Sequence, residues 1–373
     1  MQTAQIYTLV NAVSKQAYGS QAITVNDPAG LISLGNQVLS SSTNTESFLN
    51  SLLQRIGQTI YAQRLYENKL RDMNIASMRW GAILQKLSFP LPEAVEDDAY
   101  NLVDGQSIDQ YVVAKPDVDQ KLFVARAPYM FMRTTPLWQL EEAFQSESAM
   151  AGFISNVNIS VRNALEVALE NLGRLTIATG IAEASAATQR VQLLTEYNTI
   201  ASPTTTLTPD SALLNSDFLR YAIRRIKRVS KGMTDMGVLY NDGTVQRHTP
   251  FDAQRIRVLS DFNLALETVV EYAAFHEEYA RLEGFTELNF WQAAEAGSER
   301  SINVKKISTG DTFTADNVVA VIHDRDAIGI YQEFQRTLTS PVNARGAYYN
   351  TFYHCMNNRL VDRSENFVYF ELS

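Results

Sequence analysis

The sequence predicts an α+β fold built from two or three subdomains, and three observations support this prediction. The chain has 373 residues, more than a single compact core usually holds. Residues 57–136 contain extended patterns separated by prolines, whereas residues 146–180 place apolar side chains every three or four positions, as a long helix does. Helical and extended patterns then alternate over residues 188–312, and strand patterns close the chain.

The composition indicates a folded protein with no membrane partner. Apolar residues make up 45% of the chain and charged residues 20%, a balance typical of globular proteins. A single cysteine excludes an intrachain disulfide bond, so a reducing cytoplasm is the expected compartment. No signal peptide and no apolar run of about 18 residues are visible, so we expect a soluble protein. The net charge of −9 opposes a general attraction to nucleic acid.

The N-terminal region is expected to be an extended arm followed by a short helix. Residues 1–43 are polar and mixed, and the low-complexity stretch "SSSTNTES" at 40–47 predicts an exposed joint between this arm and the body. In "TESFLNSLLQRIG" the apolar residues recur at helical spacing, and Gly57 can end the helix.

A long β excursion is predicted over residues 57–136. Its expected strands are "QTIYAQRLY", "MRWGAILQKLSF", "DQYVVAKP" and "KLFVARAPYMFMRTTP". Between the second strand and the fourth, Lys115 stands against eight acidic residues: Glu93, Glu96, Asp97, Asp98, Asp104, Asp109, Asp117 and Asp119. Their spacing fits no calcium loop and lacks its central glycine, so we predict a solvated acidic loop rather than a metal site.

The rest of the chain predicts a spine helix, an α/β unit and closing strands. The helix over residues 146–180 would span roughly 45 Å and connect distant parts of the molecule. In the α/β unit we expect a strand at "RVQLLTEYNT", an exposed loop at "IASPTTTLTPDS", a helix at "SDFLRYAIRRIKRVSKG", a strand near "RIRVLS" and a helix over "LALETVVEYAAFHEEYARL". The closing strands are "NVVAVIH", "AIGIYQEFQ", "AYYNTFYHCMNNRL" and "NFVYFEL".

The sequence carries none of the common catalytic signatures, such as a phosphate-binding glycine loop, a G-x-S-x-G elbow or paired zinc cysteines. His276 in "FHEEYA" lacks the second histidine of a zinc protease helix, because Ala280 stands there. "HDRD" at 323–326 predicts a tight turn rather than a metal or phosphate site. Cys355 and His354 are adjacent, so in a strand they point to opposite faces. We therefore expect no catalytic, cofactor-binding or metal-binding residue.

Six basic residues crowd the helix predicted at 217–231: Arg220, Arg224, Arg225, Lys227, Arg228 and Lys231. An amphipathic surface helix explains them, because apolar residues form a stripe between them. Binding to nucleic acid or to an acidic protein surface is an alternative, because six cations on a short helix repel one another. With a net charge of −9, another copy of the chain is the acidic partner that the composition favours.

The order of these elements resembles the Hong Kong 97-like fold of tailed-phage major capsid proteins. Three local sequences resemble the phi 29-type short-tailed phages within that class: "FLNSLLQRIGQTIY" at 48–61, "VNARGAYYNTFYHCMNNRL" at 342–360 and "DRSENFVYFEL" at 362–372. The chain stops at Ser373, directly after the closing strand. It is therefore expected to lack the immunoglobulin-like domain that the phi 29 type appends.

One motif within this resemblance is a turn followed by a strand. In the phi 29 type, an Asn-x-Arg-Gly turn leads into an aromatic-rich strand with Tyr-His near its middle. This chain has Asn343, Arg345 and Gly346 in the turn, and Tyr353 and His354 in the strand. Arg345 and Gly346 are expected to shape the turn.

The resemblance implies five segments. They are the N-terminal arm and short helix at 1–56, an extended loop at 57–136, the peripheral domain with the spine helix at 137–187, the axial domain at 188–312 and the peripheral-domain strands at 313–373. The loop from about Pro90 to Pro116 is expected to lie over a neighbouring subunit. Some proteins of this fold join subunits by a lysine–asparagine isopeptide bond, but Lys86, Lys115 and Lys121 do not match that pattern. No autocatalytic crosslink is expected.

The resemblance also implies a function. It predicts a non-enzymatic major capsid protein, made in the bacterial host cytoplasm, that self-assembles into pentamers and hexamers of an icosahedral virion capsid. Its expected partners are a scaffolding protein, a portal and packaged double-stranded DNA on the inner face, without a cofactor. Two alternatives stay open: an encapsulin-type compartment shell, and a soluble hydrolase that uses Cys355 and His354.

Overall fold

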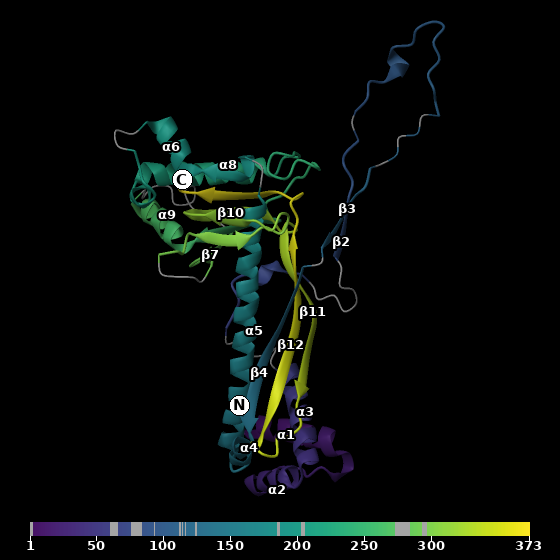
Figure 1. The fold of residues 1–373 in the computed structure, drawn as a ribbon, viewed down its shortest axis with the longest axis vertical. Coiled ribbons are helices and arrows are strands. Elements are labelled where there is room, and N and C mark those ends of the chain that lie inside the picture. Colours follow the sequence, from purple (N-terminus) through teal and green to yellow (C-terminus); the bar gives the residue numbers. More distant parts are fainter. Residues whose placement is uncertain are drawn as a thin grey trace. The chain divides into compact units, whose positions relative to one another are not determined.

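The computed structural model describes residues 3–59, 66–75, 84–92, 94–111, 113, 115, 117–123, 125–184, 187–202, 206–272, 284–292 and 297–373. Helices and strands are mixed along the chain, which confirms the predicted α+β class (Figure 1). The chain forms two compact units. The first comprises Met1–Trp80, Arg126–Leu172 and Tyr331–Asn358, and the second comprises Gly81–Ala125, Gly173–Ile330 and Arg359–Ser373. None of the helices in the described ranges combines the length and apolar character needed to span a lipid bilayer.

The N-terminal segment is helical, so the expected extended arm over residues 1–43 is wrong in its conformation. Its elements are α1 (Thr3–Tyr18), the 3-10 helix η1 (Gly19–Gln21), α2 (Pro28–Leu39) and α3 (Ser42–Thr59). Asp27 caps α2, because its carboxylate accepts the Gly30 N–H at 2.6 Å. Val10, Leu34 and Phe48 lie in one buried core, so short apolar repeats diluted by polar residues were sufficient to form packed helices.

The predicted joint and short helix form a single element. Residues 42–47 of "SSSTNTES" begin α3 instead of forming an exposed joint, and α3 continues through Gly57 to Thr59. Thr45 explains part of this difference, because its hydroxyl donates to the Val38 carbonyl at 2.9 Å and ties the start of α3 to α2. Leu49 and Leu52 are buried, which confirms the amphipathic helix itself.

A four-stranded sheet with the order β1-β11-β12-β4 accompanies these helices in the first unit. Its strands are β1 (Asn74–Ile75), β4 (Ala125–Pro136), β11 (Ile328–Thr339) and β12 (Tyr348–Val361), with the 3-10 helix η3 (Arg71–Met73) before β1 and α4 (Leu137–Ala143) after β4. Burial alternates along most of β12, as expected of a strand with one face on a core. Tyr349 of β12 joins the core of the N-terminal helices.

The predicted spine helix is confirmed as α5 (Glu147–Glu183), which runs as one helix of 37 residues (Figure 1). Met150 near its start is buried in the core of the first unit, and Ile177 and Ile181 near its end are buried as well. Gly180 is required there, because a Cβ atom at this position would lie 2.9 Å from the Phe367 ring.

A five-stranded sheet with the order β5-β13-β10-β6-β7 forms the centre of the second unit. Its strands are β5 (Arg190–Gln192), β6 (Gln254–Leu259), β7 (Phe285–Leu288), β10 (Val318–Asp324) and β13 (Phe367–Glu371). β10 is antiparallel to β13 and β6, whereas β5 and β7 are parallel to their neighbours. All residues of β10 are buried. Leu219 and Phe262 from α8 (Ser216–Gly232) and α9 (Ser260–Tyr272) lie in the same core as Ile322.

The remaining elements of the second unit are short. They are β2 (Leu84–Ser88), η4 (Asp98–Tyr100), β3 (Asp119–Phe123), η5 (Ala187–Gln189), α6 (Leu193–Ala201), α7 (Pro209–Ala212), β8 (Ile302–Lys305) and β9 (Thr312–Ala315). β2 pairs with β3, and β8 pairs with β9, both antiparallel. The connection between β2 and β3 carries the acidic residues of the predicted loop.

The expected elements of the α/β unit and the closing strands are largely confirmed. The helix at "SDFLRYAIRRIKRVSKG" is α8, and the four closing strands are β10 to β13. The strand expected at "RVQLLTEYNT" is wrong beyond Gln192, because α6 begins at Leu193 and buries Leu193 and Leu194 in the core. α9 covers the start of its predicted helix, and "IASPTTTLTPDS" includes the end of α6 and the first three residues of α7.

The structure contains some of the strands predicted over residues 57–136 and lacks others. The last predicted strand is extended as expected but corresponds to two strands of different sheets, β3 and β4, and "MRWGAILQKLSF" contains β2. Most of "QTIYAQRLY", residues 78–83 and His276 lie outside the described residues. The described residues of "DQYVVAKP" form no strand and are exposed. They have no paired strand to cover their apolar side chains.

Candidate assembly surfaces

Cys355 and His354 are separated by the strand that carries them. Cys355 is buried on one face of β12, whereas His354 is half-buried and stacks on Phe352, with ring centroids 6.3 Å apart. Burial raises the pKa of the Cys355 thiol to about 11, and a hydrogen bond with Tyr129 offsets this only in part. The thiol is therefore protonated at neutral pH, and a protonated thiol is a poor nucleophile.

The Asn343 turn has the geometry that the sequence predicts. The Asn343 side-chain oxygen accepts the N–H groups of Arg345 and Gly346, both at 3.0 Å. The Asn343 N–H donates to the Tyr348 carbonyl at 2.8 Å and closes the turn onto β12. A Cβ atom at position 346 would lie 2.3 Å from the Tyr348 ring, so Gly346 allows the turn backbone to pass this ring.

"HDRD" also forms the predicted turn, between β10 and β11. The Asp324 carboxylate accepts the Asp326 N–H at 2.8 Å and the Thr249 hydroxyl at 2.7 Å. Burial lowers the pKa of His323 to about 3, so its imidazole is neutral. Within the described segments, no group of three or more potential metal ligands is clustered.

The acidic loop, defined as residues 90–118 between β2 and β3, exposes both charged and apolar side chains. Val95 and Tyr100 are each 88% exposed, and Tyr111 is 80% exposed. Its hydrogen bonds are local, as between Asn101 and Glu96 at 3.0 Å and between the Ala99 N–H and Asp97 at 2.9 Å. Exposed apolar residues at this density are typical of a surface that another molecule covers.

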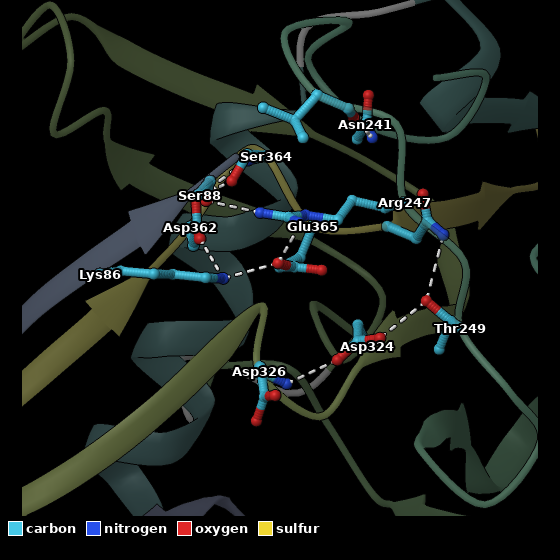
Figure 2. A network of polar contacts seen from close by, with 12 residues as sticks. Lys86, Ser88, Asn241, Arg247, Thr249, Asp324, Asp326, Asp362, Ser364 and Glu365 are labelled. Carbon is cyan, nitrogen blue, oxygen red and sulfur yellow. Dashed lines mark hydrogen bonds and ion pairs between the residues drawn. The ribbon is translucent and has the colours of Figure 1, made fainter. Parts of the chain in front are cut away.

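The base of the acidic loop is held by a network of partly buried charges around the buried Asp362 carboxylate, which we call the polar anchor (Figure 2). The Lys86 ammonium, on β2, lies 2.5 Å from the Asp362 carboxylate and 2.6 Å from that of Glu365. Both acidic residues belong to the turn between β12 and β13. Arg247 lies 2.9 Å from Glu365 and donates to the Ser88 hydroxyl at 2.6 Å. Lys86 and Ser88 are successive inward-facing residues of β2. Both are joined to this turn by charge-assisted contacts, Lys86 directly and Ser88 through Arg247.

The contacts within the polar anchor favour the charged forms of Lys86 and Asp362. Burial alone would raise the pKa of Asp362, but Lys86 and hydrogen bonds from Ser364 hold that pKa below its ordinary value. Burial alone would lower the pKa of Lys86, but hydrogen bonds to Asp362 and Glu365 raise it above its ordinary value. The side chain of Asp362 is 0% exposed, so the carboxylate depends on these partners to remain charged.

Lys121 on β3 adds a second contact to the polar anchor. Its ammonium lies 3.5 Å from both Asp242 and Asp362. Lys115 is exposed in the acidic loop. Of the three lysines considered for a crosslink, Lys86 and Lys121 therefore hold the base of the loop. Sequence reasoning missed the polar anchor, because Lys86 and Asp362 are 276 residues apart and no local pattern connects them.

The basic helix, α8, has the predicted amphipathic character. Phe218, Ile226 and Val229 are buried, whereas Arg220, Arg224, Arg228 and Lys231 form an exposed stripe. Arg225 lies between the two faces and binds Glu196 of α6 through Nε at 2.8 Å and Nη2 at 3.0 Å. The stripe and the acidic loop are two oppositely charged surfaces of the same unit.

The fold, with its long spine helix and a loop anchored at its base, is the Hong Kong 97-like fold, which chains in solved phage capsid structures share. A chain in the capsid structure of Staphylococcus phage Andhra is similar, with a TM-score of 0.56 and 9% identity over 83% of this chain and 86% of that one. A chain in the capsid structure of cyanophage P-SCSP1u is also similar, with a TM-score of 0.51 and 10% identity over 83% of this chain and 90% of that one.

The family model of Phi29-like phage major capsid proteins matches residues 10–371. The chain therefore belongs to this family. The major capsid protein of Bacillus phage B103 is 20% identical over 370 residues, which cover 98% of this chain and 72% of that protein. The chain is a phage major capsid protein whose copies form the virion shell, and the comparisons do not support the compartment or the hydrolase alternative.

Proposed function

We propose that the shell is icosahedral, that it is built from pentamers and hexamers of this chain, and that it encloses double-stranded DNA. Assembly in the bacterial host cytoplasm would involve a scaffolding protein and a portal. The observation that carries this proposal is the acidic loop, whose base is fixed by buried charges while its apolar residues are exposed. Many weak contacts between copies give a closed shell large total stability, and point-group symmetry limits how they can close.

The five segments inferred from the sequence are our proposed domains. Residues 1–56 serve as the N-terminal segment, 57–136 as the extended loop, 137–187 and 313–373 as the peripheral domain, and 188–312 as the axial domain. The helical packing of the N-terminal segment around Val10 and Leu34 favours an arm that docks as a folded piece. The part of the loop from Pro90 to Pro116 would lie over a neighbouring subunit.

We also propose that the protein has no catalytic activity and forms no autocatalytic crosslink. The protonated Cys355 thiol supports the first statement, and the ion pairs of Lys86 and Lys121 support the second. A crosslinking lysine must be neutral to attack an amide carbon, whereas the contacts of Lys86 favour its charged ammonium.

Expression of the chain with the other head proteins of its phage, followed by electron microscopy and sedimentation, tests the proposal. We expect closed icosahedral particles that protect double-stranded DNA from nuclease. Denaturing gels should show a single band of 41.8 kDa, because no covalent bond joins the copies. A uniform species of one or a few subunits, or particles without DNA and with a cargo enzyme, would contradict it.

A further inference from the structure

The strongest unexplained feature of the second unit is a cleft of about 590 Å³ lined by four arginines. Arg190 comes from β5, whereas Arg224, Arg225 and Arg228 come from α8. We call this site the arginine cleft. Among the described residues that line it, Glu196 is the one acidic residue beside these four cations, so this lining is positive.

Two of the four arginines have countercharges within the chain. Arg225 binds Glu196 in a bidentate arrangement, and Arg190 Nη2 lies 2.5 Å from Glu371. Arg224 and Arg228 are exposed, and among the described residues neither side chain has a hydrogen bond or an ion pair within 4 Å, although Arg228 acts on Glu196 at longer range and helps to lower its pKa. Because they are four residues apart on one helix, their guanidinium groups project side by side. The cleft therefore offers two adjacent unpaired cations.

The cleft also has apolar positions at its rim. Ile200 is 71% exposed and Leu239 is 54% exposed, and both line the cleft. A free inorganic anion would pair with the arginines and leave these side chains in water. A segment that alternates carboxylates with apolar side chains would satisfy both features at once.

The acidic loop has this chemistry. Between Lys86 and Lys115 the sequence has no basic residue and six acidic ones: Glu93, Glu96, Asp97, Asp98, Asp104 and Asp109. Exposed apolar residues lie among them, including Val95, Tyr100 and Leu102. The hydrogen bonds of the described loop residues are local, so within one chain these carboxylates and the exposed apolar groups stay accessible to a partner.

We propose that the arginine cleft of one copy binds the acidic loop of a second copy. The inference rests on the proposed function, because it names the receptor for a loop that lies over a neighbour. Arginine pairs with carboxylates in a fork geometry that gives direction as well as affinity. Each copy would offer one loop and receive another, and such a head-to-tail contact closes into a ring when the rotation permits. Rings of this kind fit pentamers and hexamers.

A charge-exchange experiment tests the proposal. The variant Arg224→Glu/Arg228→Glu should lower the yield of closed particles by about tenfold or more, because like charges would face each other across the contact. Its control is Arg220→Glu/Lys231→Glu, which reverses two exposed charges of the same helix outside the cleft and also removes the surface ion pair of Arg220 with Asp217 at 3.6 Å. The control should assemble like the wild type, and both variants should keep a Tm within about 4 °C of it.

Reversing charges in the acidic loop tests the other side of the proposed contact. Glu96→Arg/Asp97→Arg alone should also fail to assemble, and combining it with Arg224→Glu/Arg228→Glu should restore particles. Normal particles from the cleft variant would overturn the inference, and so would normal shells that only lose DNA, since the cleft would then bind nucleic acid. If the wild type itself forms no shells, the proposed function fails, which is a different result.

Crosslinking determines whether the loop belongs to a second copy. In the variant Arg228→Lys, a carbodiimide can join the lysine directly to a carboxylate of the loop. When ¹⁴N and ¹⁵N chains are mixed before assembly, we expect mixed-isotope crosslinks to Glu96 or Asp97. Crosslinks found within single chains alone would overturn the assignment to a second copy.

Discussion

The polar anchor and the arginine cleft both gather charge in the second unit, but they differ in where the countercharge lies. In the polar anchor, Lys86 lies 2.5 Å from Asp362, whose side chain is 0% exposed. In the arginine cleft, Arg224 and Arg228 are exposed, and among the described residues neither has an ion pair within 4 Å. A charge satisfied within the chain stabilises the fold, whereas a charge left at the surface is available to a partner. The comparison predicts that substitutions in the two regions affect different properties.

The largest effect on stability is expected from Lys86→Met. This variant leaves Asp362 buried without its main cation, and breaking a buried pair costs about 3 kcal/mol of unfolding free energy. Urea denaturation of the unassembled subunit measures this loss. Lys115→Met, which removes an exposed lysine of the acidic loop, is the control and should change the free energy by less than about 0.5 kcal/mol. Equal effects of the two variants would mean that the polar anchor is not a stabilising site.

The next prediction concerns how the difference in unfolding free energy between wild type and Lys86→Met depends on pH. The pKa of Asp362 is lowered in the fold, so its stabilisation is present above the ordinary aspartate pKa and is lost as pH falls through the lowered value. The pKa of Lys86 is raised, so its stabilisation is present below the ordinary lysine pKa and is lost as pH rises through the raised value. The difference between wild type and Lys86→Met should therefore be flat near neutrality and shrink at both extremes. A difference that grows on acidification would contradict this account.

A smaller effect is expected from Arg225→Met. Its loss of stability should lie between that of Lys86→Met and that of Arg224→Met. Arg225 is about as exposed as Lys86, at 26% against 24% of the side chain, but its partner Glu196 is 32% exposed whereas Asp362 is 0% exposed. Water therefore screens the attraction between Arg225 and Glu196 more strongly. We expect a loss of about 1 kcal/mol in the unfolding free energy, also by urea denaturation. A loss as large as that of Lys86→Met would remove the distinction between buried and surface pairs on which the comparison depends.

The smallest effect on stability is expected from Arg224→Met. The guanidinium has no ion pair in the described chain, so its removal should change the unfolding free energy by less than about 0.5 kcal/mol. The same variant should lower the yield of particles, and the two measurements together separate folding from assembly. A destabilised subunit with unchanged particle yield would show that Arg224 serves its own fold.

Much of the fold could be predicted because several elements carry strong local patterns. α8 matches the predicted helix from Ser216 to Gly232, since its apolar and basic residues alternate at helical spacing. α5 and the fully apolar stretch of β10 are equally clear. α1 and α2 were missed because their apolar positions, such as Val10 and Leu34, become a pattern only when the helices pack together. α6 was mistaken for a strand because Leu193 and Leu194 are adjacent, which suits a strand as well as a buried helix start.

The candidate surfaces were predictable only in part. The cations of α8 and the carboxylates of the acidic loop are local in sequence, so both surfaces were visible before the fold was known. The polar anchor was not, because it joins β2 to a turn near the C-terminus. The arginine cleft also needs Arg190 and Leu239, which only the fold brings to α8. Side chains gathered from distant segments leave no periodic signal in the chain.

An electron cryomicroscopy map of the assembled particle would show which surface receives the acidic loop. We expect the acidic loop of one subunit to occupy the arginine cleft of its neighbour, with carboxylates of the loop facing Arg224 and Arg228. A map in which this cleft is open to solvent in every subunit, while the acidic loop contacts another surface, would contradict it.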